Sequence, residues 1–134
     1  MSTAKATYLG NLRTENEHLK SGSTYITDAP TDNNGKGEAF SPTDTVATGL
    51  ANCMLTVMGI KARDMKVDMD GATALVTKTM AANPRRISKI EVVLNMPSGI
   101  DEKSQKILEN TGRTCPVMQS LHPDIDKAIT FHWG

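Results

Sequence analysis

The chain has 134 residues, with 15 Lys plus Arg balanced by 15 Asp plus Glu, and two cysteines. This length suits a single domain, residues 1–134, and the even charge balance gives no overall field to attract nucleic acid or an anionic membrane surface. No uninterrupted run of about 18 apolar residues occurs, so we expect a soluble, cytoplasmic protein. In a reducing compartment two cysteines are catalytic, redox-sensing or simply buried.

The first part of the chain predicts antiparallel strands. Residues 6–12 and 23–27 are short runs with β-branched and aromatic side chains, and they flank the polar segment 13–22. Residues 28–37 follow, with one proline, two asparagines and two glycines. That composition predicts a loop.

A long helix is predicted to begin after Ser41. The Ser41 hydroxyl suits an N-cap, Pro42 suits the first helical position, and Asp44 completes a capping box. We expect the helix to end or bend at Gly59 or at the pair 63–64. Spacings of three and four residues predict one buried apolar stripe made of Val46, Leu50, Cys53, Val57 and Ile60.

A second hairpin is predicted next. Residues 67–80 alternate loosely and residues 87–96 alternate clearly, with Asn83–Pro84 as the turn between them. Residues 101–110 then predict an amphipathic helix. Its inward side chains are expected to be Ile107 and Leu108, and its outward ones Glu102, Lys103 and Lys106.

The chain is predicted to end with a short helix and a strand. Pro116 suits the first turn of a helix through Leu121, and residues 129–133 alternate large apolar with smaller polar side chains. Strands, a helix, strands, helices and a strand in this order predict an α+β fold without a regular βαβ repeat.

The two cysteines occupy different helical positions. Cys53 lies more than three turns into its helix, beyond the reach of the N-terminal dipole, so another segment would have to supply a cation to stabilise its thiolate. The candidate cations are Arg13, Arg63, Arg85, Arg86 and Arg113. Cys115 is expected at an N-cap, where free N–H groups favour a thiolate, and it is therefore predicted to be the more acidic thiol. That both are inert core residues stays open.

Two segments resemble a known family when taken together. The run from Ser41–Pro42 through Gly49–Leu50–Ala51–Asn52–Cys53, followed by Thr114–Cys115–Pro116–Val117–Met118, resembles the OsmC and Ohr family of thiol-dependent hydroperoxide reductases. The order of the predicted elements is similar over nearly the whole chain. The resemblance implies an OsmC-like fold, with antiparallel sheets packed on a long central helix, in an intertwined homodimer.

The resemblance also implies a reaction. Cys53 would attack an organic hydroperoxide and become a sulfenic acid, and Cys115 would resolve it as a disulfide that an external dithiol reduces. Arg13 corresponds to the family's arginine and would stabilise the thiolate. The implied protein is a stress-response peroxidase that needs no cofactor.

One position departs from the family. Its hydroperoxide reductases have a glutamate after the helix-starting proline, which holds the arginine, whereas this chain has Thr43. Asp44 is a possible supporting residue, but it already serves as a helix cap. A weaker hold on Arg13 is predicted. The alternative function is an OsmC-like module that binds a small molecule or senses redox state without efficient turnover.

Metal chemistry finds little support in the sequence. The histidines, His18, His122 and His132, are scattered, and no Cys or His pair has zinc-site spacing. We therefore expect no metal and no bound cofactor.

Overall fold

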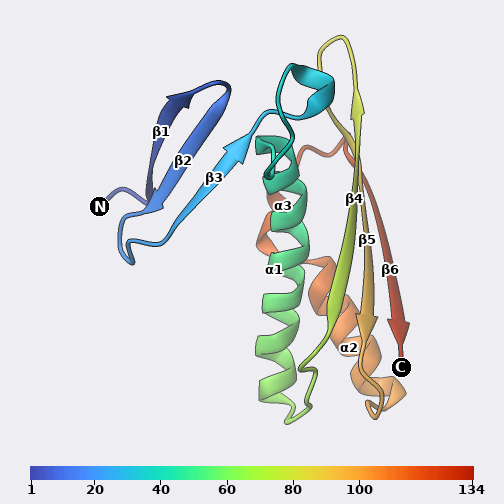
Figure 1. Ribbon diagram of the computed structural model, residues 1–134. Coiled ribbons are helices and arrows are strands. Elements are labelled where there is room, and N and C mark those ends of the chain that lie inside the picture. Colours follow the sequence, from blue (N-terminus) through green and yellow to red (C-terminus); the bar gives the residue numbers. More distant parts are fainter. The chain divides into compact units, whose positions relative to one another are not determined.

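The computed structural model describes all residues, 1–134, and forms two compact units, residues 1–46 and 47–134. The first unit contains a three-stranded antiparallel sheet in the order β1–β2–β3 (Figure 1). Its elements are β1 (Ala4–Gly10), β2 (Arg13–His18), β3 (Thr24–Asp28) and a short 3-10 turn, η1 (Thr31–Asn33).

The central strand of this sheet differs from the sequence prediction. Strands are predicted only on either side of residues 13–22, yet β2 pairs along its length with both neighbours. Its sequence, Arg-Thr-Glu-Asn-Glu-His, has no apolar side chain, so no alternation of polar and apolar residues marks it. Pairing of the backbone with two flanking strands makes it a strand despite its composition.

The second unit contains the other sheet, in the order β4–β5–β6. The predicted hairpin is confirmed, because β4 and β5 are antiparallel, but β5 and β6 are parallel. This sheet is therefore mixed rather than wholly antiparallel. Two helices lie between β5 and β6 in the chain, and parallel neighbours require such a crossover. The elements are β4 (Thr73–Ala81), β5 (Arg86–Met96), α2 (Glu102–Arg113), α3 (Pro116–Ser120) and β6 (Asp126–Trp133).

Helix α1 (Pro42–Asp64) begins as the sequence predicts. The Ser41 N–H donates to Asp44 Oδ2 at 3.0 Å, and the Asp44 N–H donates to Ser41 Oγ at 3.0 Å. This reciprocal pair is the capping box, with Asp in the usual place of Glu. The helix continues through Gly59 and ends at Asp64, the later of the two expected ends.

Of the predicted stripe on α1, only Leu50 is fully buried. Val46 and Ile60 are 44% and 58% exposed, and Cys53 is only half-buried. The core face lies about one residue further round the helix, on small and flexible side chains. A pattern search based on large β-branched residues does not detect these small and flexible side chains, although such side chains allow helices to pack closely. The buried residues are Ala47, Leu50, Ala51, Met54, Met58 and Ala62.

The core of the second unit lies between its sheet and its helices, which cover one face of the sheet (Figure 1). Ile90, Val92 and Leu94 on β5 are fully buried, and Leu108 of α2 packs in the same cluster. The inward position of Leu108 is confirmed, as are the exposed positions of Glu102, Lys103 and Lys106, while Ile107 is half-buried. The α+β class is confirmed.

Helix α1 is also the one helix that, by length and composition alone, could span a membrane. A core helix of a folded domain meets the same criteria. Six of its residues lie in the core of the second unit and three more pack against it, so packing within the protein accounts for its apolar character.

Replacing Leu108 with alanine is predicted to destabilise the protein by about 2–5 kcal/mol, because the side chain is fully buried and its removal leaves a cavity. Denaturant unfolding followed by circular dichroism measures this change. Lys103→Ala, on the exposed side of the same helix, is the control and should change the free energy of unfolding by less than about 0.5 kcal/mol. Equal effects of the two substitutions would contradict the assignment of the core.

Candidate functional site

The structure brings the two cysteines together. Cys115 is the N-cap of α3, is 1% exposed, and its Sγ accepts a hydrogen bond from the Met118 N–H at 3.4 Å. Cys53, on α1, is half-buried and lies near enough to Cys115 to raise the pKa of that thiol. Both thiols are free. A partly exposed cysteine therefore lies beside a fully buried one.

Burial governs the acidity of Cys115. Loss of solvent raises the pKa of the Cys115 thiol, the neighbouring Cys53 raises it further, and the Met118 N–H offsets only part of the rise. The prediction that the N-cap position makes Cys115 acidic is therefore wrong. The N-cap geometry itself is as predicted, but α3 has only five residues and removal from water outweighs its N–H donors.

Arg13 occupies a defined place in the first unit. It is the first residue of β2, after a tight turn in which Gly10, Asn11 and Leu12 all have positive φ angles. On the neighbouring strand its partner in register is Asp28, the last residue of β3. Cross-strand partners lie close enough for their side chains to meet. The turn and the register together place the guanidinium beside this carboxylate.

Two carboxylates hold the Arg13 guanidinium. Arg13 Nη2 donates to Asp28 Oδ2 at 3.1 Å and to Glu38 Oε1 at 2.9 Å. The side chain of Asp28 is fully buried, and that of Glu38 is 62% exposed. The prediction of a weakly held Arg13, drawn from Thr43, is therefore wrong. The negative charge comes from β3 and from the segment before α1.

Asp28 and Glu38 are the residues that sequence reasoning missed. Asp28 is the first residue of the predicted loop, 28–37, and Glu38 lies just beyond it, so neither belongs to a motif. Only the register of β2 with β3 and the path of residues 29–40 bring them to Arg13. A strand-end aspartate opposite an arginine becomes a recognisable signal once β2 is known to be a strand.

The other candidate arginines have different surroundings. Arg113 stacks over the ring of Phe131, 5.2 Å from its centroid, and Arg86 donates to the carbonyl oxygens of Ala82 and Pro84 at 2.9 Å. Arg63 lies along α1 near its C-terminal end. None of these interactions involves a cysteine.

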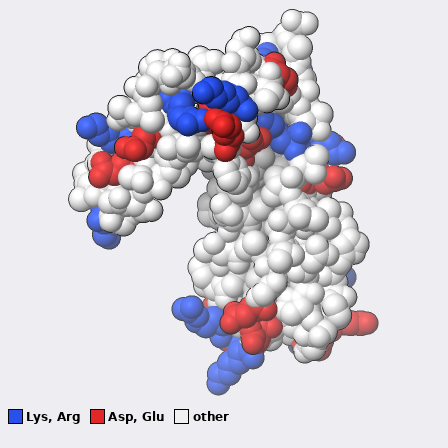
Figure 2. Space-filling view, viewed as in Figure 1, with Lys and Arg blue, Asp and Glu red and all other residues white.

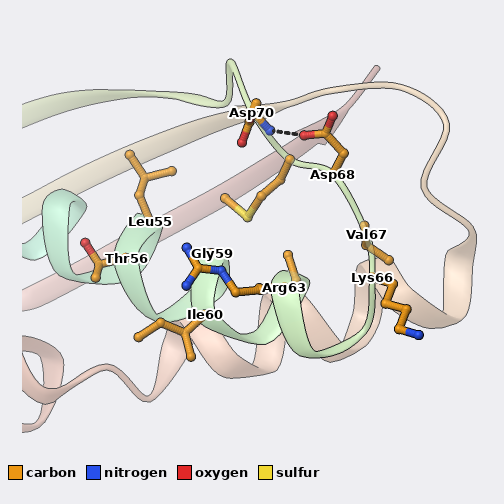
Figure 3. Close-up of a pocket in the computed structure, with 11 residues that line it drawn as sticks. Leu55, Thr56, Gly59, Ile60, Arg63, Lys66, Val67, Asp68 and Asp70 are labelled. Carbon is orange, nitrogen blue, oxygen red and sulfur yellow. Dashed lines mark hydrogen bonds between the residues drawn. The ribbon is translucent and has the colours of Figure 1, made fainter.

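A hollow of about 600 Å³ lies beside the second half of α1. It is formed by that helix and the segment leading to β4, and in Figure 3 Leu55, Thr56 and Arg63 approach it from the helix side. In the facing segment the Asp70 N–H donates to Asp68 Oδ1 at 2.8 Å. Neither cysteine lines this hollow, so it is separate from the thiol pair.

No group of three or more His, Cys, Asp or Glu side chains is arranged to hold a metal ion. Several methionines of the second unit differ in how far they are buried. Met54, Met58 and Met96 are buried in the core, while Met80 and Met118 are half-buried.

Comparison with known proteins agrees with this arrangement of elements. The sequence profile of the OsmC-like protein family matches residues 35–129. A structure from Psychrobacter arcticus, provisionally named an osmotic stress induced and detoxification response protein, is 57% identical. It has a TM-score of 0.95 over 98% of this chain and 96% of that chain. No curated protein sequence matched.

Two more distant structures share the fold. An organic hydroperoxide resistance protein OsmC from Legionella pneumophila is 20% identical, with a TM-score of 0.72 over 98% of this chain and 96% of that one. An organic hydroperoxide resistance protein from Elizabethkingia anophelis is 16% identical, with a TM-score of 0.76 over 100% and 98%.

Two sheets, a long capped helix and a pair of adjoining cysteines define an α+β protein with a thiol site. The chain belongs to the OsmC-like protein family. The family resemblance noted from the two cysteine segments is thereby confirmed.

The raised pKa of Cys115 predicts slow alkylation. In a Cys53→Ser variant, iodoacetamide should modify Cys115 with a pH midpoint above that of the same thiol in the unfolded protein, because burial disfavours the thiolate. Intact-mass measurements across a pH series give both midpoints. A midpoint in the folded protein below that of the unfolded one would contradict the dominance of burial.

Asp28 predicts a pH-dependent contribution to stability. The Glu38 N–H and then Arg13 hold the pKa of this carboxyl below its usual range, so its ionised form is favoured in the folded protein. The stabilisation is complete above the unfolded pKa of about 3.9 and is lost as pH falls through the lower folded value. The Tm difference between wild type and Asp28→Asn should be largest near neutral pH and shrink below about pH 4. A gap that widens in acid would contradict this sign.

Proposed function

We propose that this protein is a thiol-dependent peroxidase that reduces organic hydroperoxides. The Cys53 thiolate attacks one oxygen of the peroxide, the O–O bond breaks, and the alkoxide leaves and takes a proton to become an alcohol. Cys53 is then a sulfenic acid. The Cys115 thiol condenses with it, water leaves, and a disulfide forms. An external dithiol restores both thiols by exchange.

The unequal exposure of two adjoining cysteines carries this proposal. Cys53 is half-buried and can be reached, whereas Cys115 is 1% exposed and lies beside it. A peroxide therefore meets Cys53 first, and the resulting sulfenic acid has its reaction partner already in place. This assignment of attacking and resolving thiols rests on access rather than on the acidity of Cys115.

Arg13 is proposed as the activating cation. A thiolate in partly apolar surroundings needs a nearby positive charge, and a guanidinium stays charged at any working pH. Asp28 and Glu38 raise the pKa of Arg13 still further from its usual value. Both of their bonds use Nη2, so the N–H groups of Nε and Nη1 donate to no protein acceptor and are available to a thiolate or a peroxide oxygen.

A homodimer is proposed because each unit exposes surface that a partner would cover. The first sheet exposes large apolar side chains on both sides of its strands, and a three-stranded sheet needs a covered face for stability. Helix α1 has no charged residue from Thr45 to Ile60, and Figure 2 shows a largely uncharged surface along it. The exposed side chains of the first unit include Tyr8, Leu9, Leu12, Tyr25, Ile26 and Phe40.

A small-molecule-binding or redox-sensing module is the second candidate. The hollow beside α1 favours it, since it combines apolar side chains such as Leu55, Ile60 and Val67 with the charged Arg63. Such a protein would keep the fold and the thiol pair but would not turn over hydroperoxide.

Intact mass spectrometry separates these functions. Reduced wild-type protein treated with one equivalent of cumene hydroperoxide should lose two hydrogens within a minute as the Cys53–Cys115 disulfide forms. Cys53→Ser should not react, and Cys115→Ser should stop at a sulfenic acid or go on to over-oxidised forms. Absence of any reaction in the wild type over minutes would exclude the peroxidase and favour the second candidate.

A further inference from the structure

Arg13, Asp28 and Glu38 form a closed ring of hydrogen bonds. Asp28 Oδ2 accepts from Arg13 Nη2 at 3.1 Å and from the Glu38 N–H at 2.9 Å, and Glu38 Oε1 accepts from the same Nη2 at 2.9 Å. The main chain reinforces the ring, because the Asp28 N–H donates to the Phe40 carbonyl at 2.9 Å. The end of β3 and the segment before α1 are thus tied to the guanidinium together.

The two carboxylates in this ring are not equivalent. The Asp28 side chain is fully buried, so water does not compete for its bond to Arg13, whereas Glu38 is 62% exposed and its bond exchanges readily with water. Asp28 also carries a cost, because its buried Oδ1 accepts no hydrogen bond. A buried carboxylate with one unpaired oxygen is a poor choice for stability alone.

We propose that Asp28 is the positioning residue for Arg13, with Glu38 as a replaceable second partner. By fixing one nitrogen of the guanidinium, Asp28 leaves the N–H groups of Nε and Nη1 free to donate to a thiolate or a peroxide oxygen. The inference rests on the proposed peroxidase function and adds the residues that orient its cation. It also accounts for an arginine that is well held while the helix start carries Thr43 and no glutamate.

Asp28→Asn is a clean test because asparagine has the same shape. Its carbonyl oxygen can still accept the Glu38 N–H, so the substitution keeps the volume and the local backbone but removes the charge that holds Arg13. Glu38→Gln makes the same change at the exposed partner. Glu15→Gln is the matched control, because Glu15 lies on the same strand as Arg13 and is exposed.

The first measurement is the rate of Cys53 oxidation by cumene hydroperoxide as a function of pH. We expect Asp28→Asn to slow it by about 10- to 100-fold, as misplacement of an activating group does, and to shift the pH profile upward. Glu38→Gln should slow it about threefold, in keeping with an exposed ion pair. Glu15→Gln should leave it unchanged. Circular dichroism confirms that each variant is folded at the assay temperature.

The second measurement does not depend on peroxide. In protein labelled with ¹⁵N-arginine, restricted rotation should give Arg13 distinct, slowly exchanging side-chain NMR signals. These should be lost in Asp28→Asn and largely kept in Glu38→Gln. Arg13→Lys identifies the signals by their disappearance.

The outcomes separate this inference from the function it rests on. A reactive wild type with an unchanged rate in Asp28→Asn overturns the inference and leaves the peroxidase standing. So does a slow Asp28→Asn variant whose Arg13 signals stay as in wild type, because Asp28 would then act by another route. If wild type itself does not react, the peroxidase fails, and the NMR comparison alone decides whether Asp28 fixes Arg13.

Discussion

Burial opposes the ionisation of a thiol, and this opposition governs the chemistry of Cys115. A sulfur removed from water loses the solvation that a thiolate requires, so its pKa rises unless donors or cations replace the water. Cys115 shows the effect directly, since the N-cap of α3 supplies an N–H donor and the pKa is still raised. A covered thiol of this kind is poorly suited to attack a peroxide. In the proposed reaction it would instead react with the sulfenic acid formed on Cys53.

Because burial disfavours a thiolate, the proposed reactivity of Cys53 depends on a nearby cation. Cys53 lies too deep in α1 to use the helix dipole, so the proposed thiolate needs a positive charge from another segment. An arginine meets this need without losing its charge, but a flexible arginine would lose entropy each time it bound. The bonds from Arg13 to Asp28 and Glu38 remove much of that freedom during folding instead. Both bonds converge on Nη2, so in the proposed peroxidase Nε and Nη1 would be left to interact with the thiolate.

Much of the fold could be predicted from the sequence, because local signals were strong where they existed. The capping box at Ser41, the hairpin turn at Asn83–Pro84 and the N-cap at Cys115 each depend on residues adjacent in the chain. Strand β2 could not be predicted, because its six residues are all polar and only pairing with its neighbours makes them a strand. The buried face of α1 was misplaced for a related reason, since alanine and methionine give weaker signals than valine and isoleucine although they pack more closely here.

Some residues of the candidate site could likewise be predicted from the sequence, and others could not. Both cysteines and Arg13 could be named from local sequence and resemblance, whereas the residues that hold Arg13 depend on strand register and on the path of a loop. A glutamate beside the helix-starting proline is readable in a sequence; Asp28 is fifteen residues from Arg13 and becomes its neighbour only through the β2–β3 pairing. A missing motif residue therefore does not mean a missing interaction. The charge that holds an arginine is defined by geometry, and a different strand end can supply it.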